Sequence, residues 1–198
     1  MVGRKSLAIG AVLWLSACAT TPSGDEIMET IVSSSVRIER KSRGPAIAHV
    51  ERQCEVGEVQ RVIELLAASG TGRVNLKVEN GASAEVITRL PTDKVSWLVV
   101  AVTDEGFRLY TASTEALNRT TQAKGPEGVE ISDVPLREGQ PDWERLTNLV
   151  RVLASKQRVY GTSVVAPAGG RADRAIEALQ QIRFALPEPQ QRRYLLAL

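Results

Sequence analysis

The stretch that ends at Cys18 constrains the chain more than any other feature of the sequence. Arg4 and Lys5 precede an apolar run at residues 7–15, and small residues follow that run. A positive start, a short apolar centre and small residues at the end are typical of a secretory signal sequence. The apolar run has about nine residues, too few for a membrane-spanning helix, which needs roughly 20. We therefore expect the chain to be exported and then cut near this point.

The cleavage site is read from residues 15–18, Leu-Ser-Ala-Cys, which resemble a bacterial lipobox. In such a site the cysteine receives a diacylglyceryl group, the chain is cut before it, and the new N-terminus is acylated. The resemblance predicts a lipoprotein signal peptide at 1–17 and a lipidated tether at 18–35, with Cys18 as the lipidation site. Several acyl chains on one residue give stable membrane attachment. Ala19 favours a periplasmic domain anchored to the outer membrane, and the inner membrane stays open as the alternative.

Charge and cysteine content limit the partners and the covalent structure of the mature chain. The sequence has 25 Lys and Arg against 23 Asp and Glu, and Arg4 and Lys5 leave with the signal, so the mature side chains balance. A chain without excess positive charge gives no reason to expect nucleic acid as a partner. Cys54 is then the one remaining thiol, so we expect no internal disulfide. We interpret Cys54 as a small buried apolar residue.

Apolar periodicity predicts an α+β fold with a mixed β-sheet and about three amphipathic helices. The helices are expected at residues 56–69, 141–155 and 172–186. The strands are expected at residues 36–40, 46–50, 73–79, 84–90, 95–102, 107–112, 159–166 and 193–198. Asn80-Gly81 predicts a type I′ hairpin. The polar stretch 113–140 is expected to be a long loop, functional or partly disordered.

Two segments share the order strand, turn, amphipathic helix, short link and strand. They cover residues 46–76 and 163–196, and a shift of 116 residues superimposes them. Apolar or small residues coincide at Val50 and Ala166, Val59 and Ala175, and Ile63 and Leu179. We therefore divide the folded part into a first α/β unit at 36–91 and a second at 95–198, which contains the loop 113–140. Whether the halves are a true duplication stays open.

Both segments resemble the C-terminal half of the periplasmic domain of the ExbD/TolR biopolymer-transport family. In that family the half runs Ala-Asp, then Tyr-Gly, then an amphipathic helix that ends in Ala-Gly. The corresponding residues of the first segment are Val50-Glu51, Val56-Gly57 and Ser69-Gly70. The second segment begins at Ala166 but has Pro167 and Ala172 where the family has Asp and Tyr. The family's front half is matched once, by the hairpin at 104–106 and the helix that begins at Pro141.

One departure decides what the resemblance implies. Members of the family cross the inner membrane once, with an aspartate in the spanning helix that serves proton-driven work. This chain has no acidic residue before Asp25 and no such helix is expected, so only the periplasmic module is carried over. The resemblance implies partners among envelope proteins, such as an ExbB/TolQ-like protein or a TonB/Tol-type machine. A homodimer is also open.

The sequence offers little that would support catalysis. His49 is the only histidine, and with Cys54 it makes too small a ligand set for a metal. The turn 169–171, Gly-Gly-Arg, precedes a helix and could hold an anion, but it lacks the spacing of a phosphate loop. A basic cluster near the tether, explained by a solvated face or by contact with lipid headgroups, consists of Arg37, Arg40, Lys41 and Arg43. We expect no enzyme activity, no cofactor and no metal.

The leading hypothesis is a non-catalytic envelope lipoprotein that binds proteins of a trans-envelope transport or energy-coupling system. The alternative is an assembly or transport-accessory lipoprotein of the outer membrane. Strand edges at 36–40, 84–90 and 193–198 offer unpaired backbone groups that recruit strands from other chains. The tail is the main candidate for a partner-binding edge strand, since it is too apolar to lie in water. Its candidate residues are Tyr194, Leu195, Leu196 and Leu198.

Overall fold

The computed structural model describes residues 28–31, 33, 35–40, 45–119, 132–156, 159–186 and 193–197. These residues form two five-stranded sheets and four helices, so the predicted α+β fold is confirmed. The strands are β1 (Met28–Ile31), β2 (Val36–Arg40), β3 (Ala46–Val50), β4 (Arg73–Val78), β5 (Ser83–Ile87), β6 (Ser96–Thr103), β7 (Gly106–Ser113), β8 (Ser132–Pro135), β9 (Gly161–Val165) and β10 (Tyr194–Ala197). The helices are α1 (Val56–Ala68), α2 (Thr114–Arg119), α3 (Trp143–Lys156) and α4 (Ala172–Arg183).

The first sheet has the strand order β1-β2-β3-β4-β5. β3 and β4 are parallel because α1 connects them and returns the chain to the starting end of the sheet. The other neighbours are antiparallel. Along β4, Leu76 is buried while Arg73 and Lys77 are exposed, which follows the alternation of side chains in a strand. The sheet therefore has one buried face and one open face.

The second sheet has the strand order β10-β9-β6-β7-β8. β9 is parallel to both β6 and β10, and α4 connects β9 to β10 as α1 connects β3 to β4. β6 is buried on both faces, which explains its continuous apolar sequence. Leu98 and Val100 belong to the main core with α3 and α4. Trp97 and Val99 lie on the opposite face, in a second and smaller apolar cluster.

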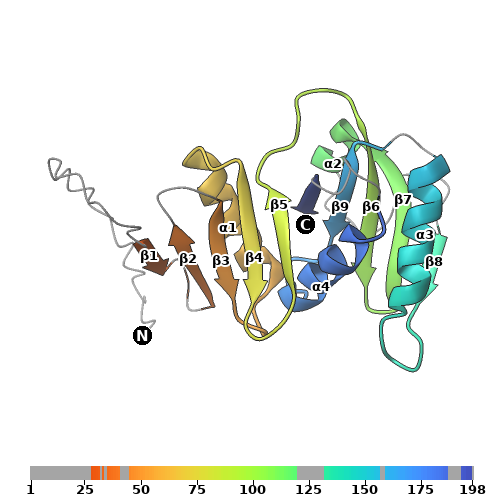
Figure 1. Cartoon of the computed structure of the whole chain (residues 1–198), viewed down its shortest axis with the longest axis horizontal. Coiled ribbons are helices and arrows are strands. Elements are labelled where there is room, and N and C mark those ends of the chain that lie inside the picture. Colours follow the sequence, from red (N-terminus) through yellow and green to blue (C-terminus); the bar gives the residue numbers. More distant parts are fainter. Residues whose placement is uncertain are drawn as a thin grey trace, which may run out of the picture.

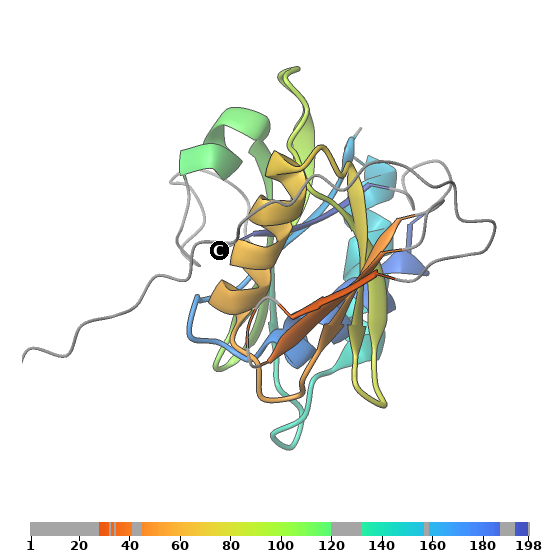
Figure 2. The same ribbon diagram turned by 90° about the vertical axis from the view of Figure 1, so that its left-hand side faces the viewer.

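The two sheets lie side by side, with β5 and β10 in contact between them (Figure 1). Among the described residues no ladder of hydrogen bonds joins these two strands. Figure 1 shows α3 and α4 in front of the second sheet, and Figure 2 shows α1 on the opposite side, against the first sheet. The open face of the first sheet is therefore turned toward the viewer in Figure 1.

The buried stripes of α1 and α4 follow the predicted helical period. In α1 the buried residues are Val56, Val59, Val62, Ile63 and Leu66. In α4 they include Ala172, Ala175, Ile176, Leu179 and Ile182. Gly70, at a φ of 85°, follows the end of α1 in the left-handed conformation that glycine adopts without steric cost. Both helices therefore begin and end within a few residues of the positions that their apolar pattern indicates.

The third predicted helix, α3, buries only some of its apolar residues fully. It begins at Trp143 rather than at residue 141. Its fully buried residues are Leu146, Val150 and Ala154, whereas Trp143, Leu149 and Leu153 are only partly buried. Ala154 is small enough to approach the core closely, so the helix turns that side inward.

The hairpin at Asn80-Gly81 is not of type I′. That turn needs a positive φ at both central residues, whereas Asn80 has a φ of 50° and Gly81 has no positive φ. Val78 N instead donates to Ala82 O at 2.9 Å, which closes a three-residue loop. Such a loop needs only one residue in the left-handed region, and asparagine tolerates it.

The stretch 113–140 is not one long loop. It contains α2 and β8, and β8 pairs antiparallel with β7. Residues 120–131, which lie between these two elements, are outside the described residues. β8 has a single buried apolar side chain, Val134, which is too weak a pattern to predict a strand.

The two strand–helix–strand units meet at a junction where residues 116 positions apart make equivalent contacts. Two backbone hydrogen bonds close it, from Val56 N to Gly170 O at 2.8 Å and from Ala172 N to Cys54 O at 2.9 Å. The shift converts each bond into the other. Glu55 and Arg171, also 116 residues apart, form the β-bridge between them. A local pseudo-two-fold axis therefore passes through this bridge, although a duplication stays a prediction.

Candidate functional site

Of the residues predicted to be functional, the structure describes most of those in the C-terminal tail but not Cys18 near the N-terminus. Cys18, and with it the predicted signal peptide and most of the tether, lies outside the described residues, as does Leu198. Lipidation at Cys18 therefore stays a prediction. Residues 194–197 are described and form β10.

The apolar tail is built into the core of the protein. β10 is the last strand of its sheet and pairs in parallel with β9. Tyr194, Leu195 and Leu196 are buried, and the Tyr194 hydroxyl donates to Arg183 O at 3.2 Å. Burial raises the pKa of Tyr194 above its usual value, so the phenol stays neutral. The other side of β10 contacts β5, and a role of these residues in partner binding stays a prediction.

The other two predicted strand edges are also covered. β2, at residues 36–40, is paired on both sides because β1 lies outside it. β5, in the stretch 84–90, lies against β10. In the described parts of the two sheets, the outermost strands other than β5 and β10 are β1 and β8.

Cys54 is an inert buried thiol, as its sequence context indicates. Its side chain lies in the main core and is 2% exposed. Sγ donates to Glu58 Oε2 at 3.4 Å. Burial first, and then this hydrogen bond, raise the pKa of Cys54 to about 12. A thiol that stays protonated at neutral pH is a poor nucleophile and a poor metal ligand.

The turn at 169–171 serves the junction between the units. Gly170 O accepts the hydrogen bond from Val56 N. Arg171 forms an ion pair with Asp173 in the first turn of α4, and Asp173 Oδ1 accepts a hydrogen bond from Arg174 N at 2.8 Å. A carboxylate of the chain itself therefore occupies the position that an external anion would take at this helix end.

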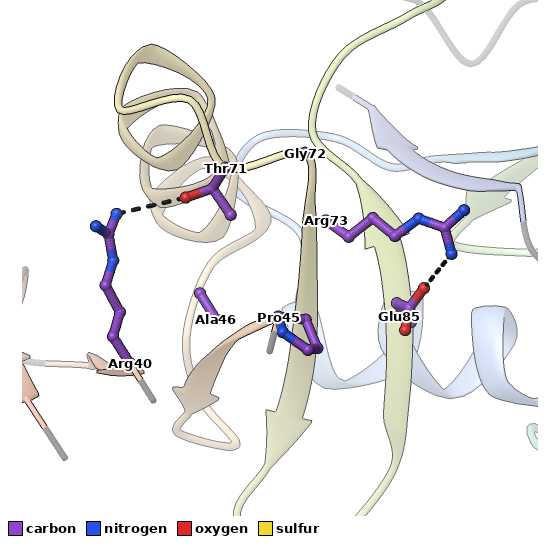
Figure 3. A pocket seen from close by; sticks show the side chains of 7 residues that line it. All are labelled: Arg40, Pro45, Ala46, Thr71, Gly72, Arg73 and Glu85. Atoms are coloured by element: carbon purple, nitrogen blue, oxygen red, sulfur yellow. Dashed lines mark hydrogen bonds and ion pairs between the residues drawn. The ribbon is translucent and has the colours of Figure 1, made fainter. Parts of the chain in front are cut away.

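A notch of about 440 Å³ lies where α1 ends beside the first sheet (Figure 3). Figure 3 shows Arg40 and Arg73 on opposite sides of the notch, which has Pro45 and Ala46 between them. Arg73 is neutralised by Glu85 on the neighbouring strand, at 2.7 Å.

The other arginines at this end of the first sheet stabilise the end of α1. Arg40 donates to Ser69 Oγ at 2.7 Å and to Thr71 Oγ1 at 3.5 Å. Arg89 donates to Ala67 O in the last turn. Cations at this position complement the free carbonyls and the negative end of a helix. We therefore interpret the notch of Figure 3 as structural.

The open face of the first sheet carries a row of basic side chains without such an explanation. Arg37, His49 and Lys77 lie directly opposite one another on β2, β3 and β4. His49 is partly buried, and its Nε2 lies 3.0 Å from Glu39 Oε2. Arg37 and Lys77 are exposed and form no ion pair within the described residues.

A pocket of about 280 Å³ lies along this row. Besides the row itself, its charged lining consists of Glu51 and Glu79, which follow β3 and β4 at the same end of the sheet. Glu79 N donates to Val50 O at 3.0 Å, which holds the two strand ends together. We call this site the mixed-charge pocket and define it by Arg37, His49, Glu51, Lys77 and Glu79.

Among the described residues, no group of His, Cys, Asp and Glu side chains could hold a metal ion. In the same part of the chain, no helix has both the length and the apolar character to cross a membrane. Comparisons with protein-family models, curated proteins and solved structures found no match. The ExbD/TolR resemblance therefore rests on the sequence motifs alone.

Sequence reasoning missed the mixed-charge pocket because its members come from three strands. In the sequence, Arg37 is noticed only as part of a local basic cluster, and Lys77 only as a residue on the polar side of a predicted strand. The strand alternation does place Arg37, His49 and Lys77 on outward positions. The missing step was the register between the strands, which residues far apart in the sequence determine.

Proposed function

We propose that this protein is a non-catalytic lipoprotein of the periplasm, anchored to the outer membrane through acylated Cys18. It binds proteins of a trans-envelope transport or energy-coupling system. The observation that carries the proposal is the position of β1, which is the outermost strand of the first sheet and lies within the predicted tether at 18–35. Within the described residues β1 pairs only with β2, so the tether presents an open strand edge close to the membrane.

An open edge binds protein segments because its free N–H and C=O groups accept an added strand. The two outer edges of the protein differ in this respect. β8 ends in Pro135, which has no N–H to donate, and Arg108 forms an ion pair with Asp133 across β7 and β8 at 2.9 Å. β1 contains no proline and has one charged residue, Glu29, among four. We therefore assign partner binding to β1.

The two parallel strand–helix–strand units support the ExbD/TolR-like reading of the module. β3-α1-β4 and β9-α4-β10 have the order expected from that resemblance. In the resembled family the edges of two copies pair to form a dimer. Here two such units share one chain, so the remaining β1 edge is free for an envelope partner or for a second copy of the protein.

Site-specific photo-crosslinking in cells tests the assignment. A photoreactive residue replaces Thr30 in β1, and the matched control replaces Ser132 in β8. We expect position 30 to give crosslinked envelope proteins and position 132 to give few or none. Equal yields from both positions, or adducts from position 132 alone, would contradict a partner site at β1. An ExbB/TolQ-like partner supports the energy-coupling role, whereas outer-membrane assembly proteins favour the accessory-lipoprotein alternative.

Mass spectrometry of membrane-extracted protein tests the anchor independently. The first residue of the mature chain should be Cys18 with attached acyl chains, and Cys18→Ser should prevent both cleavage and stable attachment. An N-terminus at Met1, or attachment that survives Cys18→Ser, would refute the lipoprotein assignment.

A further inference from the structure

The row on the open face of the first sheet places two exposed cations, Arg37 and Lys77, on either side of His49. Side chains directly opposite one another on neighbouring strands lie about 5 Å apart, so both cations border the surface around His49. Neither cation forms an ion pair within the described residues. Their charge is complementary to that of an anionic group bound over the row.

The carboxylates on the same face do not pair with the two cations of this row, Arg37 and Lys77. Glu39 pairs with His49, and Glu85 pairs with Arg73 at the far end of the sheet. Glu51 and Glu79 line the mixed-charge pocket, but neither lies within ion-pair distance of Arg37 or Lys77 in the described structure. The pocket is therefore lined by two cations that form no ion pair and, at the strand ends, by two carboxylates. Its volume is about 280 Å³.

We propose that the mixed-charge pocket binds a phospholipid headgroup that holds a phosphate and a primary ammonium, as in phosphatidylethanolamine. The phosphate takes hydrogen bonds from Arg37 and Lys77, which are strong when both partners are charged. The ammonium has three N–H donors and places them on Glu51 and Glu79. A purely anionic headgroup would leave these two carboxylates unpaired beside it. The inference rests on the membrane anchor of the proposed function.

The predicted anchor explains why the ligand is a membrane lipid. Residues 19–27 separate Cys18 from β1, and about nine extended residues span at most roughly 30 Å. β1 and β2 belong to the same sheet as the pocket, so the anchor holds this sheet near the headgroups. At the high effective concentration that a short tether gives, even a weak site is occupied.

The only histidine of the chain lies inside the pocket and reports directly on binding. Its ring signals in NMR can be followed in the full-length protein, purified without a tag, while soluble headgroups are added. We expect a saturable shift of the His49 signals with glycerophosphoethanolamine. Glycerophosphocholine, whose quaternary ammonium has no N–H to donate, and glycerol phosphate should bind at least tenfold more weakly. Comparable binding of all three compounds, or no saturable shift, would overturn the proposal.

Matched charge variants separate the two halves of the pocket. Arg37→Gln with Lys77→Gln should weaken binding of glycerophosphoethanolamine by at least tenfold, and so should Glu51→Gln with Glu79→Gln. Arg151→Gln, an exposed position on α3, is the control and should leave the affinity unchanged. If the Glu51 and Glu79 variant binds as well as the natural chain, the ammonium assignment is wrong. Unchanged melting temperatures establish that the variants remain folded.

A membrane measurement distinguishes failure of the pocket from failure of the anchor. A fluorophore on Ser83→Cys lies in the row of Lys77. Cys54 is buried, and Cys18 carries acyl chains in the lipidated protein, so neither competes for the label. In vesicles that carry a headgroup quencher, quenching at residue 83 should rise severalfold when phosphatidylcholine is partly replaced by phosphatidylethanolamine. A label on Ser155→Cys in α3 should not respond. Equal quenching in both lipids refutes the pocket, whereas loss of all vesicle attachment with intact headgroup binding in solution refutes only the anchor.

Discussion

Gly161→Ala is the most direct test of how the apolar tail is held. Gly161 begins β9, next to the first residues of β10. A Cβ at this position would lie 2.2 Å from Arg193 O and 2.9 Å from Trp97 Cζ3. Carbon and oxygen atoms without a bond normally stay at least about 3.3 Å apart. The backbone at Arg193 would therefore have to move by roughly 1 Å.

Two responses compete, and their costs decide the outcome. Expelling β10 would expose Tyr194, Leu195 and Leu196, at about 1.5–3 kcal/mol for each side chain. The sum, about 5–9 kcal/mol, is comparable to the whole stability of a typical domain. Shifting β10 while it stays docked is an overpacking problem, which costs about 1–3 kcal/mol. The shift is cheaper, so Gly161→Ala should lose about 1–3 kcal/mol of folding free energy with β10 still in place.

Urea denaturation followed by tryptophan fluorescence measures this loss. Trp97, one of three tryptophans, is fully buried against the altered site, so its share of the emission also reports whether β10 stays docked. Gly169→Ala is the matched control because a Cβ there meets no atom within 4 Å; its effect should be neutral or stabilising by up to about 1 kcal/mol. Equal stability of the two variants would refute the close approach at Gly161. A loss above about 5 kcal/mol would show that β10 is expelled instead of shifted.

Three further predictions concern single side chains. Leu146→Asp should unfold the protein, because Leu146 is fully buried and an unpaired charge in the core costs several kcal/mol. Leu149→Asp, at a half-buried site, should lower the melting temperature much less. Cys54, whose pKa is raised to about 12, should not react with a thiol reagent in the folded protein near about pH 8, and denaturation should restore the reaction. Burial, and then the nearby charge of Asp173, raise the pKa of Glu177, so its contribution favours folding at low pH and is lost as the pH rises through the folded pKa. Glu177→Gln should therefore raise the melting temperature at about pH 7. The difference from the natural chain should disappear toward about pH 4, where the side chain at residue 177 is neutral in both proteins. Reaction of folded Cys54, or a constant difference for Glu177→Gln across this range, would contradict the burial of these groups.

The sequence predicts local structure well wherever a period repeats several times. The stripe from Val56 to Leu66 has five residues buried in the core, and α1 begins and ends within a residue of its expected bounds. The strand at 46–50 is likewise placed correctly. α3 is less accurate, because its apolar residues cover more than one side of the helix and the period does not decide which side faces inward. α2 and β8 are too short for any period to be visible.

Non-local pairing is what the sequence does not provide. The contact between β5 and β10 joins residues more than a hundred positions apart, and it turns the predicted edge strand into a buried one. The basic row depends in the same way on the register of β2, β3 and β4. A register that slipped by one residue would turn His49 inward and remove the mixed-charge pocket. The buried residues Ala48 and Leu76 fix the register, because they must reach the core.

The pseudo-two-fold axis shows why the pocket belongs to the first unit alone. The shift of 116 residues places His49 of β3 on Val165 of β9, so the same position of the unit carries a histidine in one copy and an apolar residue in the other. Val165 is buried in the second apolar cluster, which Leu117 of α2 and Tyr160 help to cover. In the first unit the corresponding face stays open and carries Arg37 and Lys77 beside His49. The strand–helix–strand topology therefore does not dictate the charges around His49. The difference between the units is a property of the sequence on one face, which is the face that we propose for headgroup binding.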